Sequence, residues 1–140
     1  MATLSEGTTH TGKPRVLVVD DSRAIRDLIT VNLELEGFEV RSAAEGAAAL
    51  DVLASWRPDV MTLDVVMTGL DGLSTLERLR ADPVYADLPV VLVTARAQPS
   101  DRDRGSLLGA DDYVSKPFEP ADLVAVVSRL AAEGRRSTSG

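Results

Sequence analysis

The segment VLVVDDS, residues 16–22, decides how the chain is expected to fold. Its four consecutive aliphatic side chains are typical of a strand buried on both faces, and such strands belong to parallel sheets. Two aspartates follow the strand directly, and Ser22 is then a natural N-cap for a helix. The segment therefore predicts a buried strand that ends in an acidic turn and leads into a helix.

Four further apolar runs alternate with segments of helical spacing. The runs at Val60–Leu63 and Val90–Val93 are strong, whereas those at Phe38–Val40 and Tyr113–Val114 are weaker. Strands that alternate with helices predict a parallel sheet with helices on both faces and right-handed crossovers. The expected fold class is α/β, a doubly wound five-stranded parallel sheet of five βα units with strand order 2-1-3-4-5.

The expected helices carry apolar residues three or four positions apart, as helices with one apolar face do. Four stripes have this spacing: Ala24, Leu28, Val31 and Leu35; Ala47, Leu50, Leu53 and Ala54; Leu73, Leu76 and Leu79; and Leu123, Val127 and Leu130. A further helix at Asp101–Leu108 is only weakly indicated, because the segment contains Gly105 and two large apolar residues. Gly37 and Gly109 mark expected helix ends.

Composition limits the folded unit and the classes of function. Residues 1–13 and 134–140 are rich in Ser, Thr and Gly, which predicts two disordered tails around one domain at 14–133. No apolar run approaches the ~20 residues of a membrane span, and no signal peptide is evident, so a cytoplasmic protein without membrane insertion is expected. A net charge of −7 argues against direct nucleic-acid binding. The lack of cysteine and the single histidine, His10, exclude thiolate and multi-histidine metal sites.

Polar residues follow four of the five expected strands. Asp20 and Asp21 follow the first strand, Asp64 the third, Thr94 the fourth and Lys116 the fifth. Each of them taken alone is more often a helix cap, a strand residue or a solvated charge. Because the carboxyl ends of parallel strands meet at one edge, their joint occurrence predicts that three carboxylates, a hydroxyl and an ammonium converge there.

The crowded carboxylates point to a bound cation. Neighbouring carboxylates resist joint ionisation, and a divalent cation that prefers oxygen ligands relieves this; Mg²⁺ fits best, with Mn²⁺ as a substitute. Lys116 supports a phosphate-binding role, because the chain has only two lysines against thirteen arginines and the other, Lys13, lies in the N-terminal tail. A compact ammonium can reach a phosphoryl oxygen or a carboxylate. The turn at Lys116–Pro117 suggests a cis peptide bond as a hypothesis.

Four motifs resemble the receiver domain of bacterial two-component response regulators. They are VLVVDDS at 16–22, DVMTLDVVMTGLDG at 59–72, PVVLVTA at 89–95 and GADDYVSKPF at 109–118, and the resemblance covers about residues 15–132. It implies a flavodoxin-like fold and a phosphorylation-controlled response regulator. Such a protein is not an enzyme beyond catalysing its own phosphorylation and slow dephosphorylation.

The resemblance also implies a role for each candidate residue. Asp64 would be the phospho-acceptor, and Asp20, Asp21, Asp64 and the backbone carbonyl of Val66 would hold Mg²⁺. Lys116 would contact the phosphoryl group. The side chain of Val66 is apolar and cannot orient an attacking water, which predicts slow loss of the phosphoryl group.

Signalling would depend on two further residues. Thr94 would hydrogen-bond the phosphoryl group, and Tyr113 would be the aromatic switch that changes the surface of helix 4, strand 5 and helix 5. The phosphoryl donor would be a histidine kinase or a histidine phosphotransfer protein, and the output a downstream protein target. The family's basic residue on the last helix is replaced by Val126, so a monomer or a weak phosphorylation-dependent dimer is expected.

The sequence leaves three alternatives open. A small phosphatase of the haloacid-dehalogenase type also uses an aspartyl nucleophile, Mg²⁺, Thr and Lys, but it expects a second acid where Val66 stands. A nucleotide binder would need a glycine-rich turn after the first strand, where DDSRAI is found. The segment 109–118 is closest to receivers joined to winged-helix domains. Only ten residues follow Leu130, so the chain is either a stand-alone receiver or the receiver fragment of a longer DNA-binding regulator.

Overall fold

The computed structural model describes residues 12–67, 71–95 and 109–139, with side chains described through residue 133. The strands are β2 (Arg15–Val19), β3 (Glu39–Ala43), β4 (Val60–Leu63), β5 (Val90–Thr94) and β6 (Asp112–Ser115). The helices are α1 (Arg23–Leu35), α2 (Gly46–Leu53), α3 (Gly72–Ala81) and α5 (Pro120–Ser139). The helix that the sequence weakly predicts at Asp101–Leu108 lies outside the described residues.

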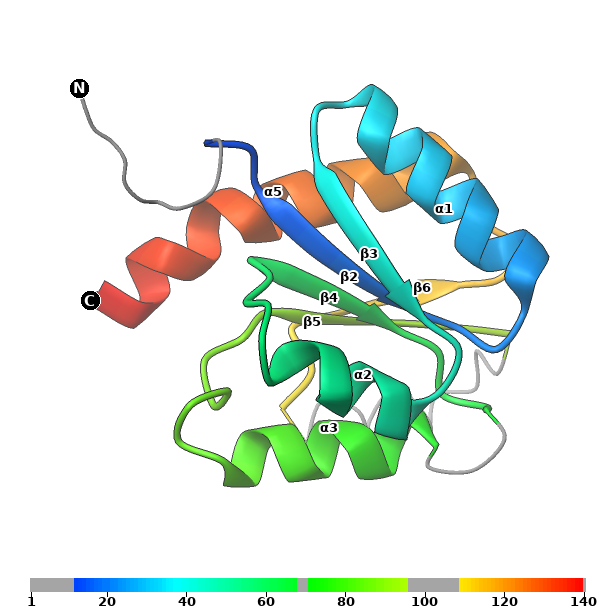
Figure 1. Ribbon diagram of the computed structural model, residues 1–140. Helices are drawn as coiled ribbons and strands as arrows, with labels where there is room; N and C mark the ends of the chain where they lie inside the picture. The colour runs from blue at the N-terminus through cyan, green and yellow to red at the C-terminus, as the bar shows by residue number, and fades with distance from the viewer. Residues whose placement is uncertain (1–11, 68–70, 96–108, 140) are drawn as a thin grey trace.

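The strands form one parallel sheet in the order β3-β2-β4-β5-β6, which confirms the predicted order 2-1-3-4-5 (Figure 1). At the end of β2, Val19 pairs with Ala43 on one side and with Leu63 on the other. At the end of β5, Thr94 pairs with Ser115. The carboxyl ends of the strands therefore lie level along one edge of the sheet.

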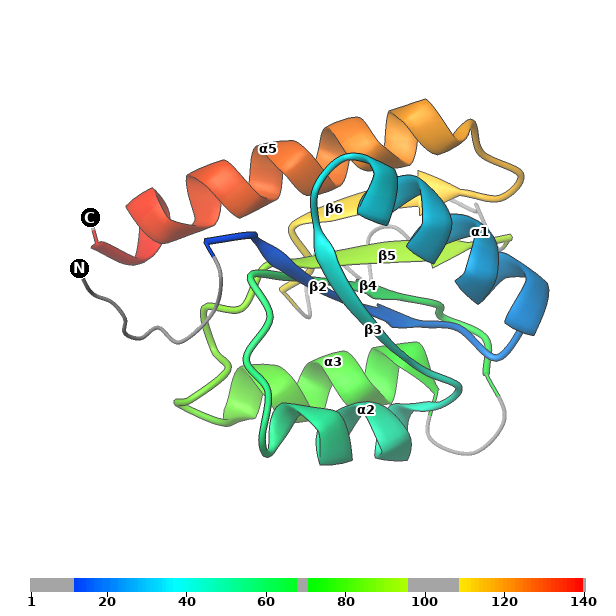
Figure 2. The ribbon, with the colours of Figure 1, turned by 45° about the horizontal axis from the view of Figure 1, so that its top comes forward.

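Helices cover both faces of the sheet. Helices α2 and α3 lie on one face and α1 and α5 on the other (Figures 1 and 2). Strands β2, β4 and β5 are in the middle and are buried along almost their whole length, so successive side chains pack alternately against the two helical layers. In β4, for example, Met61 and Leu63 pack toward α2 and α3, whereas Val60 packs toward α1 and α5. This is why these strands have continuous apolar sequences.

One predicted apolar stripe turned out to face away from the sheet. In α1, Leu28, Val31 and Leu35 are 41%, 53% and 78% exposed, and the buried side chains are instead Ile29 and Leu33. The helix has a second apolar row about a third of a turn away, and spacing alone cannot say which row faces the sheet. The spacing thus predicts the helix correctly, but its residues are not the ones that pack against the sheet.

The other helical predictions agree better with the structure. The predicted stripes of α3 and α5 are buried throughout, whereas in α2 only Leu53 of the predicted stripe is fully buried. Ser22 caps α1 as predicted, since its hydroxyl accepts a hydrogen bond from the Ile25 amide. Gly37 has a φ of +94° just after α1, which confirms the predicted helix end.

The chain ends differ in part from the composition-based prediction. Helix α5 runs through Ser139, so residues 134–139 are helical although their composition predicts an unfolded tail. Residues 1–11 of the predicted N-terminal tail lie outside the described part of the chain. None of the described helices is long and apolar enough to span a membrane.

The single tryptophan marks the amino edge of the sheet. Trp56 follows α2, is 4% exposed and packs with the core on the α2 and α3 side. The guanidinium of Arg15, where β2 begins, lies 5.3 Å from the centre of its ring, and that of Arg41 lies 4.9 Å away. Both arginines are within the range of cation–π attraction.

A half-buried arginine ties the end of α3 to the start of β6. Arg80 donates hydrogen bonds to the carbonyls of Gly109 and Tyr85 and forms an ion pair of 3.0 Å with Asp111. Burial lowers the pKa of Arg80, whereas the charges of Asp111 and Asp87 raise it. The bonding geometry shows that Arg80 fixes the chain where it enters β6.

Gly109 should be more sensitive to substitution than Gly37 because of Arg80. Both glycines have positive φ values, +100° and +94°, but a Cβ at Gly109 would lie 2.9 Å from Arg80 Nε while one at Gly37 would meet open space. We expect Gly37→Ala to lower the free energy of unfolding by about 1–2 kcal/mol through backbone strain. Gly109→Ala should lower it by about 1 kcal/mol more, because the guanidinium must shift.

Urea denaturation of the two variants measures this difference. In an Arg80→Met background the extra loss at Gly109 should largely disappear, since the crowding side chain is then flexible and uncharged. Equal losses for the two glycine variants would contradict the role given to Arg80.

Candidate functional site

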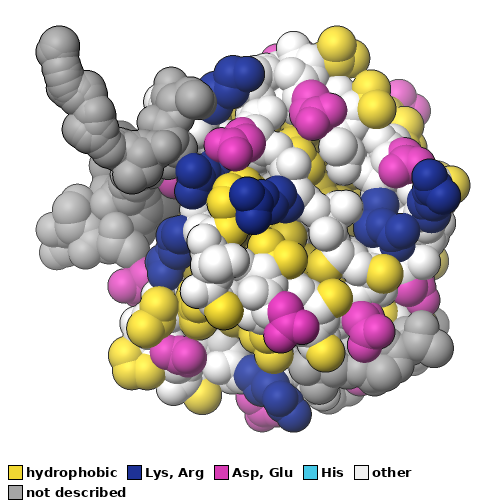
Figure 3. Space-filling model, viewed as in Figure 1, with side chains coloured by type: hydrophobic (Ala, Val, Ile, Leu, Met, Phe, Trp, Pro, Cys, Tyr) yellow, Lys and Arg dark blue, Asp and Glu magenta, His cyan; other side chains and the backbone are white. Residues whose placement is uncertain are grey.

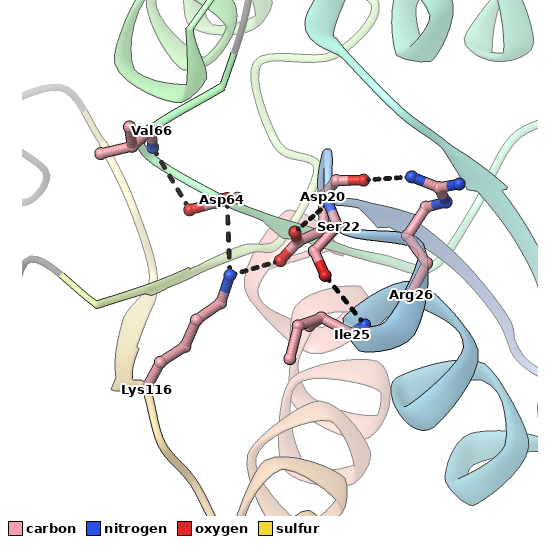
Figure 4. Close-up of polar contacts among 7 residues, drawn as sticks. All are labelled: Asp20, Ser22, Ile25, Arg26, Asp64, Val66 and Lys116. Carbon is pink, nitrogen blue, oxygen red and sulfur yellow. Dashed lines mark hydrogen bonds and ion pairs between the residues drawn. The ribbon is translucent and has the colours of Figure 1, made fainter.

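The candidate site lies where β2 and β4 end side by side. Asp20 follows β2 and Asp64 follows β4, and the two residues are only 1% and 4% exposed. The Asp64 amide donates to the Val19 carbonyl at 2.9 Å, which holds the two strand ends together. The sheet thus places two aspartates from distant parts of the sequence next to each other, as predicted (Figure 4).

A third carboxylate completes an acidic cluster. Carboxylate oxygens of Asp20, Asp21 and Asp64 all lie within 4.8 Å of one another. Asp21 is exposed whereas the other two are buried, so the cluster opens to solvent on the Asp21 side. The prediction that these three side chains converge is confirmed.

Lys116 provides the counter-charge. Its Nζ lies 2.7 Å from Asp20 Oδ2 and 3.4 Å from Asp64 Oδ2, and its side chain is 17% exposed. Its amide donates to the Thr94 carbonyl at 2.9 Å, which ties the turn after β6 to the end of β5. The Lys116–Pro117 bond is cis, in agreement with the hypothesis from the sequence. The one lysine of the predicted domain is therefore located at the acidic cluster.

Backbone amides hold the two buried carboxylates. The Ser22 amide donates to Asp20 Oδ1 at 2.9 Å, and the Val66 amide donates to Asp64 Oδ1 at 3.2 Å (Figure 4). Each of these carboxylates thus has one oxygen bound by an amide and the other oriented toward Lys116. Their orientations are set before any ligand binds.

Two residues of the site were not recognised from the sequence. Arg26 of α1 donates from Nη1 to the Asp20 carbonyl at 2.8 Å. Gly72 begins α3, and a Cβ there would lie 2.1 Å from the Asp64 carbonyl oxygen, so no other residue fits without moving the loop. Arg26 could have been found from its position four residues after the N-cap Ser22. The role of Gly72 depends on how closely it approaches the Asp64 carbonyl, which sequence patterns do not reveal.

The remaining candidates lie at or near the same edge. Thr94 is 1% exposed at the end of β5, one strand away from Asp64. Tyr113 lies further back on β6, opposite Leu92, and is partly buried against the α2 and α3 side of the core. Val66 is 49% exposed beside Asp64, so its side chain reaches solvent at the rim of the cluster.

Burial raises the pKa of the Asp64 carboxyl. The negative charge of Asp20 raises it further, while Lys116 and the Val66 amide lower it. The upward influences prevail, with burial the largest, so the charged form of Asp64 is disfavoured in the metal-free protein. The site therefore favours either a proton or an additional cation.

The donor set fits a hard divalent cation. All three side chains of the cluster offer carboxylate oxygens, the ligands that Mg²⁺ prefers, and the exposed side leaves room for water ligands. Zinc sites contain sulfur or imidazole donors, and the described part of the cluster has neither. The residues present are thus compatible with the predicted Mg²⁺.

A family model for the response regulator receiver domain matches residues 16–128. Among curated proteins, the response regulator MprA of Mycolicibacterium vanbaalenii is 45% identical over 124 residues, which are 89% of this chain and 52% of MprA. The DNA-binding dual master transcriptional regulator RpaA of Synechocystis is 39% identical over 117 residues, 84% of this chain and 48% of RpaA. The chain thus spans about half the length of these relatives.

Solved structures show the same fold. The chemotaxis protein CheY4 of Vibrio cholerae superposes with a TM-score of 0.81 at 32% identity, covering 85% of this chain and 99% of CheY4. A CheY-like receiver domain protein of Methanospirillum hungatei superposes with a TM-score of 0.84 at 27% identity, covering 90% of this chain and 99% of the other. The similarity therefore extends over nearly the whole of both neighbours.

Replacing the buried acid should stabilise the metal-free protein at neutral pH. The pKa of Asp64 is raised in the folded state above its ordinary value of 3.8. Asp64 therefore makes its full favourable contribution to the free energy of unfolding below about pH 4, where it is protonated. This contribution is lost as the pH rises through the raised pKa. We expect Asp64→Asn to unfold at higher urea concentration than the parent at pH 7 in EDTA, with the gain shrinking toward pH 4.

An exposed aspartate of α2 serves as the control for this measurement. Asp51→Asn makes the same chemical change on the surface, away from the cluster, and should alter the pH dependence of unfolding little. If Asp64→Asn is less stable than the parent at pH 7, then Lys116 and the Val66 amide outweigh burial and the charge of Asp20.

Proposed function

The chain belongs to the response regulator receiver domain family, and from that premise we propose that Asp64 is the residue that accepts the phosphoryl group. This family acts in phosphorylation-controlled two-component signalling and is not a catalytic family, which sets aside the phosphatase alternative. The observation that carries the proposal is the placement of Asp64 in the acidic cluster, with Lys116 Nζ 3.4 Å from one of its oxygens.

The donor in this proposal is a phosphohistidine of a histidine kinase or a histidine phosphotransfer protein. A carboxylate oxygen of Asp64 forms a bond to phosphorus while the bond between phosphorus and the donor nitrogen breaks. The electron pair of the broken bond stays with the imidazole, which leaves as a neutral ring when its other nitrogen carries a proton. The product is an acyl phosphate on Asp64.

Receiver domains generally bind Mg²⁺ in an acidic pocket, and this chain has the matching cluster. The side chains of Asp20, Asp21 and Asp64 and the backbone carbonyl of Val66 would hold the ion. When bound, Mg²⁺ supplies positive charge that offsets the negative charge of the carboxylates and of the phosphoryl oxygens. Asp20 and Asp21 act in this proposal as ligands, not as acids or bases.

Lys116 has the second electrostatic role. Its ammonium already lies between Asp20 and Asp64, and a small rotation of its flexible stem lets it reach an oxygen of a phosphoryl group on Asp64. It would thereby stabilise the charge that spreads over the equatorial oxygens during transfer. Its 17% exposed side chain leaves only limited screening by water.

Thr94 and Tyr113 are proposed to pass the change to the surface. The hydroxyl of Thr94, at the end of β5, would hydrogen-bond a phosphoryl oxygen and leave space behind it, into which the ring of Tyr113 on β6 would turn. The affected surface comprises β6 and α5 and would contact a downstream protein target; the helix-4 part of the expected surface lies outside the described residues. Val126 on α5 is partly buried against the core, which supports a monomer or a weak phosphorylation-dependent dimer over a charge-paired one.

Intact-mass measurement tests the phospho-acceptor. Incubation of the protein with Mg²⁺ and a small acyl phosphate should add one phosphoryl group, and Asp64→Asn should abolish the addition. Lys116→Ala should slow it by about a hundredfold, as the loss of a charge at a developing anion does. Asp51→Asn is the matched control and should be phosphorylated like the parent. Addition of a phosphoryl group to Asp64→Asn would disprove the assignment.

The phosphoryl group should persist longer than seconds because of Val66. Its exposed aliphatic side chain lies at the rim of the site and offers an attacking water no hydrogen bond. We expect Val66→Asn to shorten the lifetime of phospho-Asp64 by about tenfold, because a carboxamide can orient that water. The decay is followed by intact mass after removal of the acyl phosphate.

Val84→Asn is the control for this experiment. Val84 is 60% exposed in the loop between α3 and β5, so the same substitution changes an exposed valine outside the acidic cluster. Decay of the parent within seconds, or an equal effect of the two substitutions, would refute the role of Val66.

A further inference from the structure

We propose that Arg26 is a positioning residue for the acidic cluster: by holding the peptide between Asp20 and Asp21 it sets the direction of the Asp21 carboxylate toward the cation. The inference rests on the proposed Mg²⁺-dependent phosphorylation of Asp64. It concerns a residue that lies outside the ligand set and acts through the backbone.

Asp21 differs from its two neighbours in how it is held. The carboxylates of Asp20 and Asp64 are each bound by a backbone amide and by Lys116. The Asp21 side chain is exposed, and among the described residues no hydrogen bond or ion pair to its carboxylate is found. Its position within 4.8 Å of the others therefore depends on the backbone that carries it.

That backbone is fixed at both polar groups of Asp20. The Asp20 amide donates to the Ala43 carbonyl of β3 at 3.2 Å, and the Asp20 carbonyl accepts from Arg26 Nη1 at 2.8 Å. The same carbonyl belongs to the peptide plane that leads into Asp21, so the orientation of this plane determines where the Asp21 side chain leaves the chain. Among the described residues, no other hydrogen bond to this carbonyl is found.

Arg26 is itself firmly placed. Its amide donates to the Ser22 carbonyl at 2.9 Å, in the first turn of α1, and its side chain is half-buried. The guanidinium thus links the start of the helix to the end of the strand across the acidic turn. A large rotation of the Asp20–Asp21 peptide would break this hydrogen bond.

The charge of Arg26 cannot explain a favourable effect on cation binding. Its guanidinium lies on the side of Asp20 away from Asp64 (Figure 4), and as a positive group near a cation site it repels Mg²⁺. Electrostatics alone therefore predicts that removing this charge tightens Mg²⁺ binding, whereas positioning predicts that it weakens binding. The two explanations differ in the sign of the effect.

Calorimetric titration with Mg²⁺ distinguishes them. We expect Arg26→Met, which keeps the apolar stem but loses the donor, to raise the dissociation constant for Mg²⁺ about tenfold, the lower end of what losing an outer contact to a ligand group costs. Arg26→Lys should give a smaller increase, because lysine retains one donor with shorter reach. At saturating Mg²⁺ the phosphorylation rate with a small acyl phosphate should stay within about twofold of the parent.

Arg23→Met is the matched control. Arg23 lies on the same helix and pairs with Asp27, but its side chain is 86% exposed, so the substitution removes an equal charge from the surface. It should leave the dissociation constant for Mg²⁺ unchanged or slightly lower. If Arg26→Met does not fold, Arg26→Lys is compared with Arg23→Lys instead. Arg26→Lys must then bind Mg²⁺ more weakly than Arg23→Lys.

The outcomes separate this inference from the proposed function. If the parent protein binds no Mg²⁺, the proposed metal-dependent phosphorylation fails first. If the parent binds Mg²⁺ and Arg26→Met binds it equally well or more tightly, only the role of Arg26 is overturned. Equal weakening by the Arg23 and Arg26 substitutions would likewise reject it, since the effect would then belong to the helix as a whole.

Discussion

Electrostatic imbalance at the carboxyl edge of the sheet is the constraint on which the site depends. Three carboxylates lie within 4.8 Å of one another, and the two buried ones share one ammonium. Burial first, and the charge of Asp20 second, raise the pKa of Asp64 in spite of Lys116. This excess of negative charge in a partly buried site destabilises the metal-free protein and favours the binding of a cation. Stability is thus reduced at the place where we propose that the cation and the phosphoryl group bind.

Strand β6 is constrained at both ends, which defines where a conformational change can occur. Arg80 holds the chain at Gly109 and Asp111 before the strand begins, and the Lys116 amide is bound to Thr94 after it ends. The anchor at one end is the half-buried Arg80, and the anchor at the other belongs to the site. Tyr113, the proposed switch residue, lies between these two anchors.

The sheet and the acidic cluster could be predicted from the sequence because their signals are local and repeated. Continuous apolar runs identify buried strands, and the residues just after them must meet at one edge once the strands are parallel. The buried face of α1 could not be predicted, because that helix has two apolar rows and only packing selects Ile29 and Leu33. Gly72 and Arg26 were missed for a related reason, since their roles depend on distances to the Asp64 and Asp20 carbonyls.

The environment of Trp56 determines what intrinsic fluorescence can report. The only indole of the protein is buried at the amino edge, close to two guanidinium groups, whereas the acidic cluster is at the opposite edge, about four to five residues of strand away. Its emission should therefore follow the global unfolding of the sheet and remain nearly silent when a cation or a phosphoryl group arrives. A spectroscopic sensor of the signalling state would have to be introduced at the other edge.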